Sequence, residues 1–226
     1  MGELYILATP IGNLEDVTLR ALRILKEVDL ILCEDTRVTK KLLGRYGIMT
    51  PTLSYHSHSG LTKVEKVFAL LEEGKNLALV SDAGTPGISD PGSLLILKIK
   101  ERFKDDAVIV PIPGPNAAVA ALSASGFPAS DFLFLGFLPH KKGREKLFKE
   151  IARSERTVVF YESPHRILKT LASLQKYIPT CRVGIWRELT KIYEEFLEGS
   201  PEELLRHFTK NSEKIRGEFT VMVRAV

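Results

Sequence analysis

Short runs made only of apolar residues alternate with longer segments of helical periodicity through the first half of this sequence. In residues 17–28, for example, apolar side chains recur at steps of three and four residues, as on one face of a helix. A strand that is apolar at every position needs cover on both faces of its sheet, which in a β-α alternation indicates parallel strands. We expect these strands at residues 4–7, 30–32, 77–80 and 108–110.

The second half has strand candidates at closer spacings, which favour hairpins and a mixed sheet. A Pro/Gly-rich joint at residues 111–115 separates the two halves and suits a domain boundary. We therefore expect an α/β protein with an N-terminal parallel-sheet domain over residues 1–114 and a C-terminal mixed-sheet domain over residues 115–226. The candidate strands of the second half are residues 132–138, 157–161, 182–186, 192–197 and 218–223.

Composition places the chain among soluble globular proteins, with 226 residues of which 44% are hydrophobic and 27% are charged. No apolar run reaches the roughly 18 residues that a membrane span needs, and the N-terminus lacks a signal-peptide pattern, so we expect a cytosolic protein without membrane contact. Cys33 and Cys181 are too few and too far apart for a zinc cluster, and we expect buried thiols. The aromatic side chains expected in the core are Trp186, Phe132, Phe134 and Phe137.

Basic residues are clustered, although the net charge is only +4. Residues 140–156 contain seven Lys and Arg against three Glu. Residues 37–45 contain four basic residues and no acid, and a helix there places Arg37, Lys41 and Arg45 on one face. Each run is either a solvated helix face or a contact for a polyanion, and the two runs together favour a polyanion.

A polar or Gly/Pro-rich segment follows each expected strand of the first half. The carboxyl ends of parallel strands meet at one edge of a sheet, where loops and helix N-termini gather, so we expect a ligand there. For any single segment the alternative is a turn that needs Gly and Pro for its backbone angles. The segments are residues 9–13, 33–37, 81–87 and 111–116.

This edge lacks the known phosphate cradles, because no GxGxxG follows the first strand and no GxxxxGK[ST] occurs in the sequence. Glycines lie there beside carboxylates, without a lysine. Exposed backbone and carboxylates fit a ligand with hydroxyls and an aromatic base, including one with a positive centre. The residues concerned are Gly84, Gly87, Gly92, Asp82, Ser89 and Asp90.

Two charged segments, residues 160–166 and 187–191, follow strands in the second half. Charged residues at strand ends form either structural ion pairs or functional sites. We expect Pro164 at the first position of the next helix. His56 and His58 have a spacing that could bind a metal, but they lack nearby carboxylates, so we expect a loop pair and no metal.

Several long motifs follow one another in an order typical of a single family. They are ATPIGNLED, CEDTR, SDAGTPGISDPG, PIPGPN, YESPHR, RELTK and GEFTVMV. The chain thus resembles, over nearly its whole length, the bacterial 16S ribosomal RNA 2′-O-methyltransferases of the tetrapyrrole-methylase superfamily. Many members continue for several dozen residues past GEFTVMV, whereas this sequence ends at Val226, and we expect any RNA contact of that tail to be missing.

The resemblance implies S-adenosylmethionine-dependent 2′-O-methylation of a cytidine ribose in the decoding region of 16S rRNA. It implies a two-domain chain, a homodimer, and a cofactor cleft between the domains. The first loop, residues 9–12, departs from the GxGPG-like loop of the tetrapyrrole methylases themselves. The implied cofactor contacts are Pro10, Asp82, Gly84, Thr85, Asn116, Ala117, Tyr161 and Thr220.

Methyl transfer from a sulfonium is an in-line displacement, so positioning is expected to carry much of the rate. The ribose hydroxyl must lose a proton, and a polar group within hydrogen-bond reach should assist. Spacing does not decide among Asp35, Glu162, His165, Glu188 and Lys191; we favour Asp35 from one domain with Glu188 or Lys191 from the other as catalytic residues. The candidates for substrate contact are Arg37, Lys41, His165, Arg166 and Arg187.

Two other functional classes stay open. The first is a small-molecule or protein methyltransferase on the same fold, against which the two basic runs and the motifs CEDTR and YESPHR argue. The second is a non-catalytic ribosome-assembly factor. Such a factor is expected to carry a degraded cofactor edge, which this sequence does not show.

Overall fold

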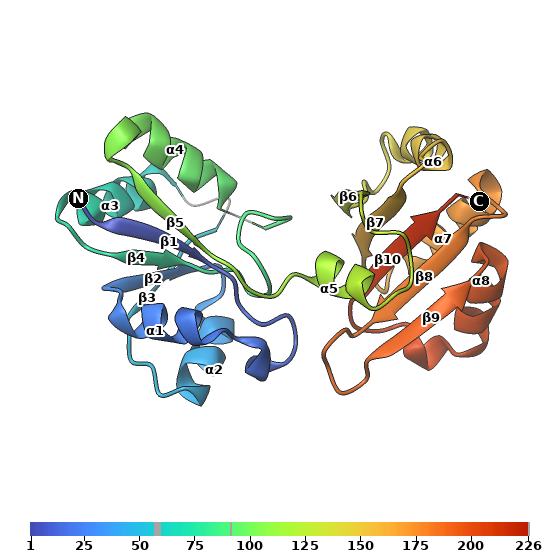
Figure 1. The fold of residues 1–226 in the computed structure, drawn as a ribbon, viewed down its shortest axis with the longest axis horizontal. Helices are drawn as coiled ribbons and strands as arrows, with labels where there is room; N and C mark the ends of the chain where they lie inside the picture. The colour runs from blue at the N-terminus through green and yellow to red at the C-terminus, as the bar shows by residue number, and fades with distance from the viewer. Residues whose placement is uncertain (57–59, 91, 226) are drawn as a thin grey trace. The chain divides into compact units, whose positions relative to one another are not determined.

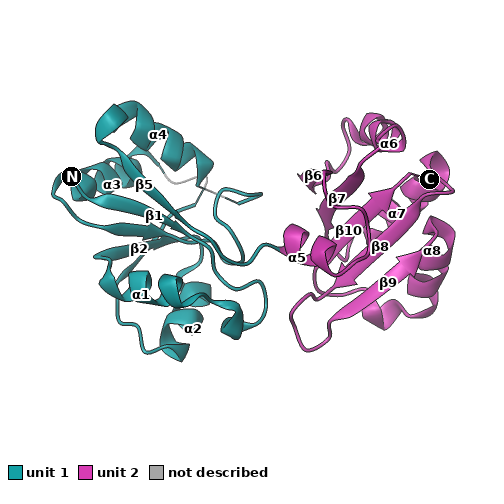
Figure 2. Ribbon diagram, in the orientation of Figure 1, with its two compact units in different colours: residues 1–116 teal, residues 117–226 magenta. Residues whose placement is uncertain are grey.

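The computed structural model describes residues 1–56, 60–90 and 92–225. The chain forms two compact units, residues 1–116 and 117–226 (Figure 2). Each unit contains one five-stranded sheet with helices packed on it (Figure 1). The predicted α/β class is confirmed, with a parallel sheet in the first unit and a mixed sheet in the second.

The first unit is built on a sheet whose five strands all run in the same direction. Its strand order is β3-β2-β4-β1-β5, so the first strand lies inside the sheet between two later ones. Parallel neighbours need crossover connections, and helices supply them. The strands are β1 (Glu3–Leu7), β2 (Leu30–Cys33), β3 (Thr52–Ser54), β4 (Leu77–Leu79) and β5 (Val108–Ile112).

Helices cover both faces of this sheet, as Figure 1 shows. Two apolar cores result: α1 and α2 pack on one face, and α3 and α4 pack on the other. Along β4 the side chains alternate between these cores, because Ala78 belongs to the first and Leu77 and Leu79 to the second. The helices are α1 (Leu19–Glu27), α2 (Thr36–Arg45), α3 (Leu61–Glu72) and α4 (Ser93–Phe103), with short 3-10 turns at Leu14–Asp16 and Lys104–Asp106.

The second unit has a sheet of order β6-β7-β10-β8-β9. Strands β6 and β7 are parallel, and the other three pairings are antiparallel, including the predicted hairpin of β8 and β9. The strands are β6 (Phe132–Phe137), β7 (Thr157–Glu162), β8 (Arg182–Arg187), β9 (Glu195–Gly199) and β10 (Phe219–Arg224).

The larger core of the second unit lies under α6, α7 and α8, where Phe148, Phe160 and Phe208 are fully buried. The short helix α5 covers the opposite face with Ala118, Ala121 and Leu122. The helices are α5 (Ala117–Ser123), α6 (Arg144–Ala152), α7 (Ile167–Tyr177) and α8 (Pro201–Lys210), with a 3-10 turn at Ser212–Lys214.

Three sequence predictions about elements were wrong or incomplete. The three-residue strand β3 was missed, because so short a segment has no readable periodicity. Strand β9 begins at Glu195 rather than at residue 192, since Glu188 and Thr190 adopt positive φ angles and form a turn before it. Helix α7 begins at Ile167, so Pro164 lies in the preceding turn and not at the first helical position.

The two thiols are buried, as predicted. Trp186 is partly buried against the α5 core, and its indole N–H donates to the carbonyl of Ala121 at 3.0 Å. The predicted core position was wrong for Phe132 and Phe137, which are 36% and 57% exposed, because β6 lies at the edge of its sheet. Within the described ranges, no helix is long and apolar enough to cross a membrane.

The close packing of Phe127 and Met222 around Gly184 gives a stability prediction. A Cβ on Gly184 of β8 would lie 2.8 Å from Cε2 of Phe127 and 3.0 Å from Cε of Met222. We expect Gly184→Ala to lower the free energy of unfolding by about 1–3 kcal/mol through overpacking. Gly44→Ala in α2 should instead raise it slightly, because nothing lies within 4 Å of that Cβ and alanine favours helix. Thermal unfolding followed by circular dichroism measures both; equal stability of Gly184→Ala and wild type would contradict the packing.

Candidate active site

The loops that follow β1, β4 and β5 are joined by hydrogen bonds at the carboxyl edge of the first sheet. Thr9 and Gly84 exchange backbone hydrogen bonds of 2.9 and 3.0 Å in an antiparallel bridge. The Thr9 hydroxyl donates to the carbonyl of Ser81 at 3.1 Å, and the Thr85 hydroxyl donates to that of Pro115 at 3.2 Å. The segments singled out in the sequence therefore form one connected surface in the first unit.

Gly84 is constrained by its backbone conformation. Its φ of +80° is an angle that side chains disfavour, and a Cβ there would lie 3.4 Å from Cγ2 of Ile11. Pro10 beside it is buried, whereas Asp82 is exposed and Thr85 and Asn116 are half-buried; Ala117, the first residue of the second unit, is half-buried too. The predicted cofactor residues of this unit thus combine a fixed backbone with an exposed carboxylate.

Asp35 caps the N-terminus of α2 and holds Arg37. Its carboxylate accepts from the Arg37 amide at 2.8 Å and from the Arg37 guanidinium at 2.6 Å. The hydrogen bond from the Arg37 side chain, and then that from its amide, lower the pKa of Asp35 to about 2. Such a carboxylate is a weak proton acceptor at neutral pH, so this geometry favours an orienting charge over a general base as the role of Asp35, a choice that the sequence left open.

A pocket of about 440 Å³ opens beside this cap. The amide of Asp35 donates to Oδ1 of Asp82 at 3.1 Å, so the loops after β2 and β4 meet at the pocket. His56 lines it, while His58 of the predicted histidine pair lies outside the described residues. No group of three or more His, Cys, Asp or Glu suited to a metal occurs in the part of the chain that the structure describes. The pocket is lined by Glu34, Asp35, Thr36, Arg37, Ser54, His56 and Asp82.

Asp90 has a different electrostatic environment from Asp35. Burial, followed by the nearby negative charges of Glu34 and Asp82, raises the pKa of Asp90 to about 6. A carboxyl with this pKa exchanges protons close to neutral pH, which is the property that proton-transfer chemistry requires. The sequence placed Asp90 among the edge residues but did not indicate its raised pKa. That pKa depends on the burial of Asp90 and on the positions of Glu34 and Asp82 in the fold.

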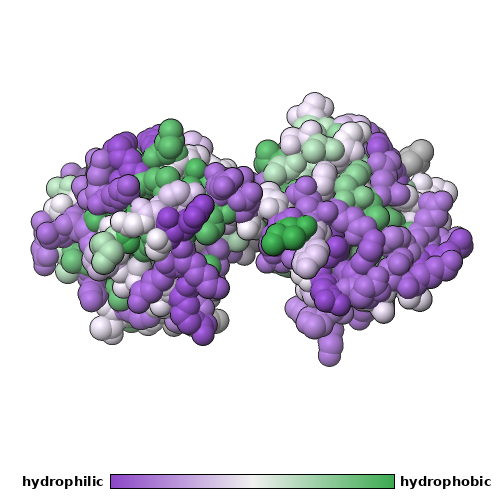
Figure 3. Space-filling view, turned by 90° about the horizontal axis from the view of Figure 1, so that it is seen from below, coloured by the Kyte–Doolittle hydropathy of each residue, from purple (hydrophilic) through white to green (hydrophobic). Residues whose placement is uncertain are grey.

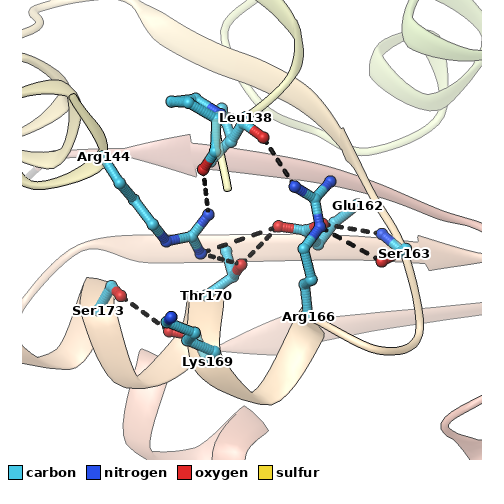
Figure 4. A network of polar contacts seen from close by, with 9 residues as sticks. Leu138, Arg144, Glu162, Ser163, Arg166, Lys169, Thr170 and Ser173 are labelled. Carbon is cyan, nitrogen blue, oxygen red and sulfur yellow. Dashed lines mark hydrogen bonds and ion pairs between the residues drawn. The ribbon is translucent and has the colours of Figure 1, made fainter. Parts of the chain in front are cut away.

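In the second unit the end of β7 holds a buried carboxylate, shown in Figure 4. The Glu162 side chain has no exposed surface. Its Oε1 accepts from the amide of Ser163 at 2.9 Å and pairs with Nε of Arg166 at 2.7 Å. Its Oε2 accepts from the hydroxyl of Thr170 at 2.6 Å, and Nη2 of Arg144 lies 3.9 Å away.

The two arginines connect this carboxylate to the segment after β6 (Figure 4). Nη1 of Arg166 donates to the carbonyl of Leu138 at 2.8 Å, and Nη1 of Arg144 donates to that of Pro139 at 3.2 Å. The geometry therefore favours a structural role for Arg166, whose predicted phosphate contact stays untested. His165 is exposed in the turn between Glu162 and α7, so its predicted substrate contact is sterically open.

The motif at residues 187–191 forms a second charged cluster. Nζ of Lys191 lies 2.9 Å from Oε1 of Glu188 and 3.0 Å from Oε2 of Glu218. Burial alone would raise the pKa of Glu188, but hydrogen bonds from Lys191 and from the Glu218 amide outweigh it and lower that pKa. For Lys191, burial alone would lower the pKa, and its bonds to Glu188 and Glu218 raise it. Both groups are therefore charged at neutral pH.

Gly217 makes this cluster possible, because a Cβ there would lie 2.1 Å from Oε1 of Glu188. Arg187 is 8% exposed and pairs with Glu195 at 3.3 Å, which favours a structural role and leaves its predicted substrate contact untested. Sequence reasoning missed Gly217 and Glu218 as partners of Glu188. The contact joins residues about 30 positions apart, and only the pairing of β8 with β10 brings them together.

The remaining predicted cofactor residues of the second unit lie side by side on the sheet. Thr220 pairs with Tyr161 of β7 and with Trp186 of β8. The hydroxyl of Tyr161 accepts from the amide of Ala118 at 3.3 Å, at the first turn of α5. Thr220 is only 5% exposed, so this part of the site offers mainly the tyrosine ring and the backbone of α5.

The two basic runs differ in how far their side chains are buried. Arg37, Lys41 and Arg45 are all exposed on α2, as their spacing predicted. In the second run Arg144 is 7% exposed, and Lys146, Lys149 and Arg156 pair with acids. Hydrophilic residues dominate the face drawn in Figure 3, with apolar side chains in smaller areas. Arg37 of the first run also pairs with an acid, Asp35, and Lys141, Lys142 and Arg153 of the second run are exposed, so both runs offer basic side chains to a phosphate.

Several solved structures that share this fold are named as methyltransferases. The chain aligns with a cobalt precorrin-4 methyltransferase at a TM-score of 0.71 and 18% identity, covering 98% of this chain and 94% of that one. It aligns with uroporphyrin-III C-methyltransferase from Thermus thermophilus, complexed with S-adenyl homocysteine, at a TM-score of 0.67 and 16% identity, covering 99% and 97%. At these identities the likeness defines the class by fold alone.

The chain belongs to the family of tetrapyrrole (corrin/porphyrin) methylases, whose family model matches residues 3–205. Ribosomal RNA small subunit methyltransferase I of Halalkalibacterium halodurans is 50% identical over 223 residues, which cover 98% of this chain and 75% of that relative. The protein of the same name from Thermotoga maritima is 46% identical, with 99% and 98% covered. The resemblance identified from the motifs is confirmed.

The buried carboxylate yields a stability prediction for the second unit. Glu162→Gln leaves Arg144 and Arg166 buried without a counter-charge, so we expect a loss of about 3–5 kcal/mol in the free energy of unfolding. Glu150→Gln removes an exposed pair with Lys146 and should cost less than about 1 kcal/mol. Trp186 is the single tryptophan and lies in this unit, so its fluorescence during urea unfolding reports both. Similar losses in the two variants would refute the structural role of Glu162.

Proposed function

We propose that this chain transfers the methyl group of S-adenosylmethionine to the ribose 2′-hydroxyl of a cytidine in the decoding region of 16S rRNA. The observation that carries the proposal is the 46% identity to the Thermotoga maritima protein named ribosomal RNA small subunit methyltransferase I. The match covers 99% of this chain and 98% of that relative. The joined loops at Thr9, Gly84 and Thr85 support it, because their hydrogen bonds hold three loops together at the edge where the sequence predicts the cofactor. A non-catalytic assembly factor has no need of such an edge.

In this proposal the cofactor lies against the carboxyl edge of the first sheet. The rigid turn at Gly84 allows close approach of the ligand to the backbone, and Asp82 supplies a carboxylate near its positive sulfonium. The predicted contacts of Tyr161 and Thr220 in the second unit, the boundary between two domains near residue 114, and the homodimer all stay predictions. We place the reaction in the cytoplasm, where ribosomal subunits are found.

The chemical step depends mainly on alignment of the hydroxyl, the methyl carbon and the leaving sulfur. Asp35 is held as a carboxylate by Arg37, and Lys191 is held as a cation by Glu188 and Glu218. These predicted catalytic residues therefore act by orientation and charge rather than as strong bases. Arg37 and Lys41, exposed on α2, are placed to contact phosphates of the RNA backbone.

Cofactor binding gives a prediction with a matched control. Gly84→Val introduces a side chain at a positive φ in the ligand edge, so we expect its Kd for S-adenosylmethionine to rise at least about tenfold. Gly74→Val introduces the same backbone conflict, at φ +82°, in a turn with open space around it. Calorimetry should show near-wild-type affinity for that control. Equal affinity for S-adenosylmethionine in the wild type, Gly84→Val and Gly74→Val would contradict the proposed cofactor site at this edge.

The reaction itself is tested by transfer of a tritiated methyl group to purified 30S particles that lack the modification. We expect the label on the ribose of one cytidine of 16S rRNA, and no label with the Gly84→Val variant. Label on a ribosomal protein or a small molecule would support the rival methyltransferase class. Cofactor-independent binding of 30S particles without any transfer would support an assembly factor.

A further inference from the structure

The pocket beside Asp35 has a composition that selects among ligand groups. Three carboxylates, those of Glu34, Asp35 and Asp82, face it together with one guanidinium, that of Arg37. Asp35 and Arg37 neutralise each other at 2.6 Å, which leaves Glu34 and Asp82 as negative charge. Ionised carboxylates accept hydrogen bonds and donate none. Arg37 and His56 also line the pocket, but its two unneutralised carboxylates favour a ligand group that presents N–H donors over a phosphate group.

The wall that carries Glu34 is fixed before any ligand binds. The amide of Tyr55 donates to the carbonyl of Cys33 at 2.8 Å, and the Ser54 hydroxyl lies 3.4 Å from the carbonyl of Glu34. Nζ of Lys63 on α3 donates to the carbonyl of Ser54 at 2.8 Å. Strand β3, which supplies Ser54, is thereby held against the end of β2. Such preorganisation suits recognition of a rigid planar group.

The pocket adjoins the proposed cofactor edge, because Asp82 belongs to both. In a nucleoside the base is bonded to the same ribose that carries the reacting 2′-hydroxyl. When that hydroxyl lies at the methyl donor, the base therefore lies close to the donor and can enter the adjoining pocket. The volume of about 440 Å³ is ample for a pyrimidine ring. A base that is read on its Watson–Crick edge must be unpaired and turned out of its helix, as is usual for sequence-specific recognition of RNA.

We infer that this pocket of the first unit binds the target cytosine, with the carboxylate of Glu34 accepting a hydrogen bond from the exocyclic N4 amino group. The inference rests on the proposed function and adds the base-reading residue. Cytosine presents an amino donor at this position, and uracil presents a carbonyl acceptor. A carboxylate accepts a hydrogen bond from the amino group of cytosine, and it repels the carbonyl oxygen of uracil. The hydroxyls of Thr36 and Ser54, which also line the pocket, can serve the remaining polar atoms of the base.

The test measures discrimination between cytidine and uridine at the methylated position. Two 30S particles are reconstituted, one with native 16S rRNA and one with the mapped target cytidine replaced by uridine. We expect wild type to methylate the cytidine particle with a kcat/KM about tenfold or more above that for the uridine particle. Glu34→Gln should bring this ratio close to one, because the amide can donate to the uracil carbonyl as well as accept from cytosine.

Glu72→Gln is the matched control. It makes the same change on the exposed surface of α3, where Glu72 pairs with Arg102 at 3.3 Å, and it should keep the wild-type ratio. The Kd for S-adenosylmethionine is measured in each variant as a second readout. An unchanged ratio in Glu34→Gln would overturn the inference alone, and an accompanying loss of cofactor affinity would assign the pocket to the cofactor. Absence of transfer by wild type to the cytidine particle would contradict the proposed function and this inference with it.

Discussion

The common direction of the five strands in the first sheet determines where this unit can bind a ligand. Because every strand runs the same way, every connecting loop after a strand emerges at one edge. The hydrogen bonds of Thr9 with Gly84 and of Asp35 with Asp82 then join loops that are more than 40 residues apart in sequence. The cap of α2, the Gly84 turn and the polar pocket all follow from this arrangement.

The second unit depends on a different device, a carboxylate buried at the end of β7. Burial of Glu162 would be costly without partners, and the structure supplies an amide, a hydroxyl and two guanidinium groups. The same arginines hold the carbonyls of Leu138 and Pro139. One buried charge thus orders the turn that presents His165 and fixes the loop after β6. Within the motif YESPHR, Glu162 and Arg166 therefore have structural contacts, whereas His165 is exposed and Tyr161 stays a predicted cofactor contact.

Periodicity predicted most of the fold, because apolar runs and helical spacing are local properties. It predicted the parallel and mixed sheets and hairpins in the second half, and β8 and β9 form one such hairpin. For residues 37–45 it indicated only that a helix there would place Arg37, Lys41 and Arg45 on one face, and α2 has this face. It failed at Phe132 and Phe137, whose exposure depends on the position of β6 at the edge of its sheet. It also failed at Pro164, since the turn before α7 is set by contacts with Glu162 that local sequence does not reveal.

The candidate site was predictable in its composition but not in its charge states. The motifs placed Asp35, Asp82 and Glu188 at strand ends. Only the fold shows that Arg37 holds Asp35 as a carboxylate and that burial, followed by neighbouring acids, raises the pKa of Asp90. Arg144 shows the same limit, because it belongs to a basic run in the sequence and to a buried network in the structure. The charge state and the role of each of these side chains depend on ion pairs and hydrogen bonds with residues that are distant in sequence.

The most direct test of the account is a ribose-methylation map of 16S rRNA from cells that lack the gene for this chain, compared with the same cells carrying a restored copy. The account predicts that one cytidine in the decoding region loses its 2′-O-methyl group in the first cells and regains it in the second. An identical map in both would contradict the account.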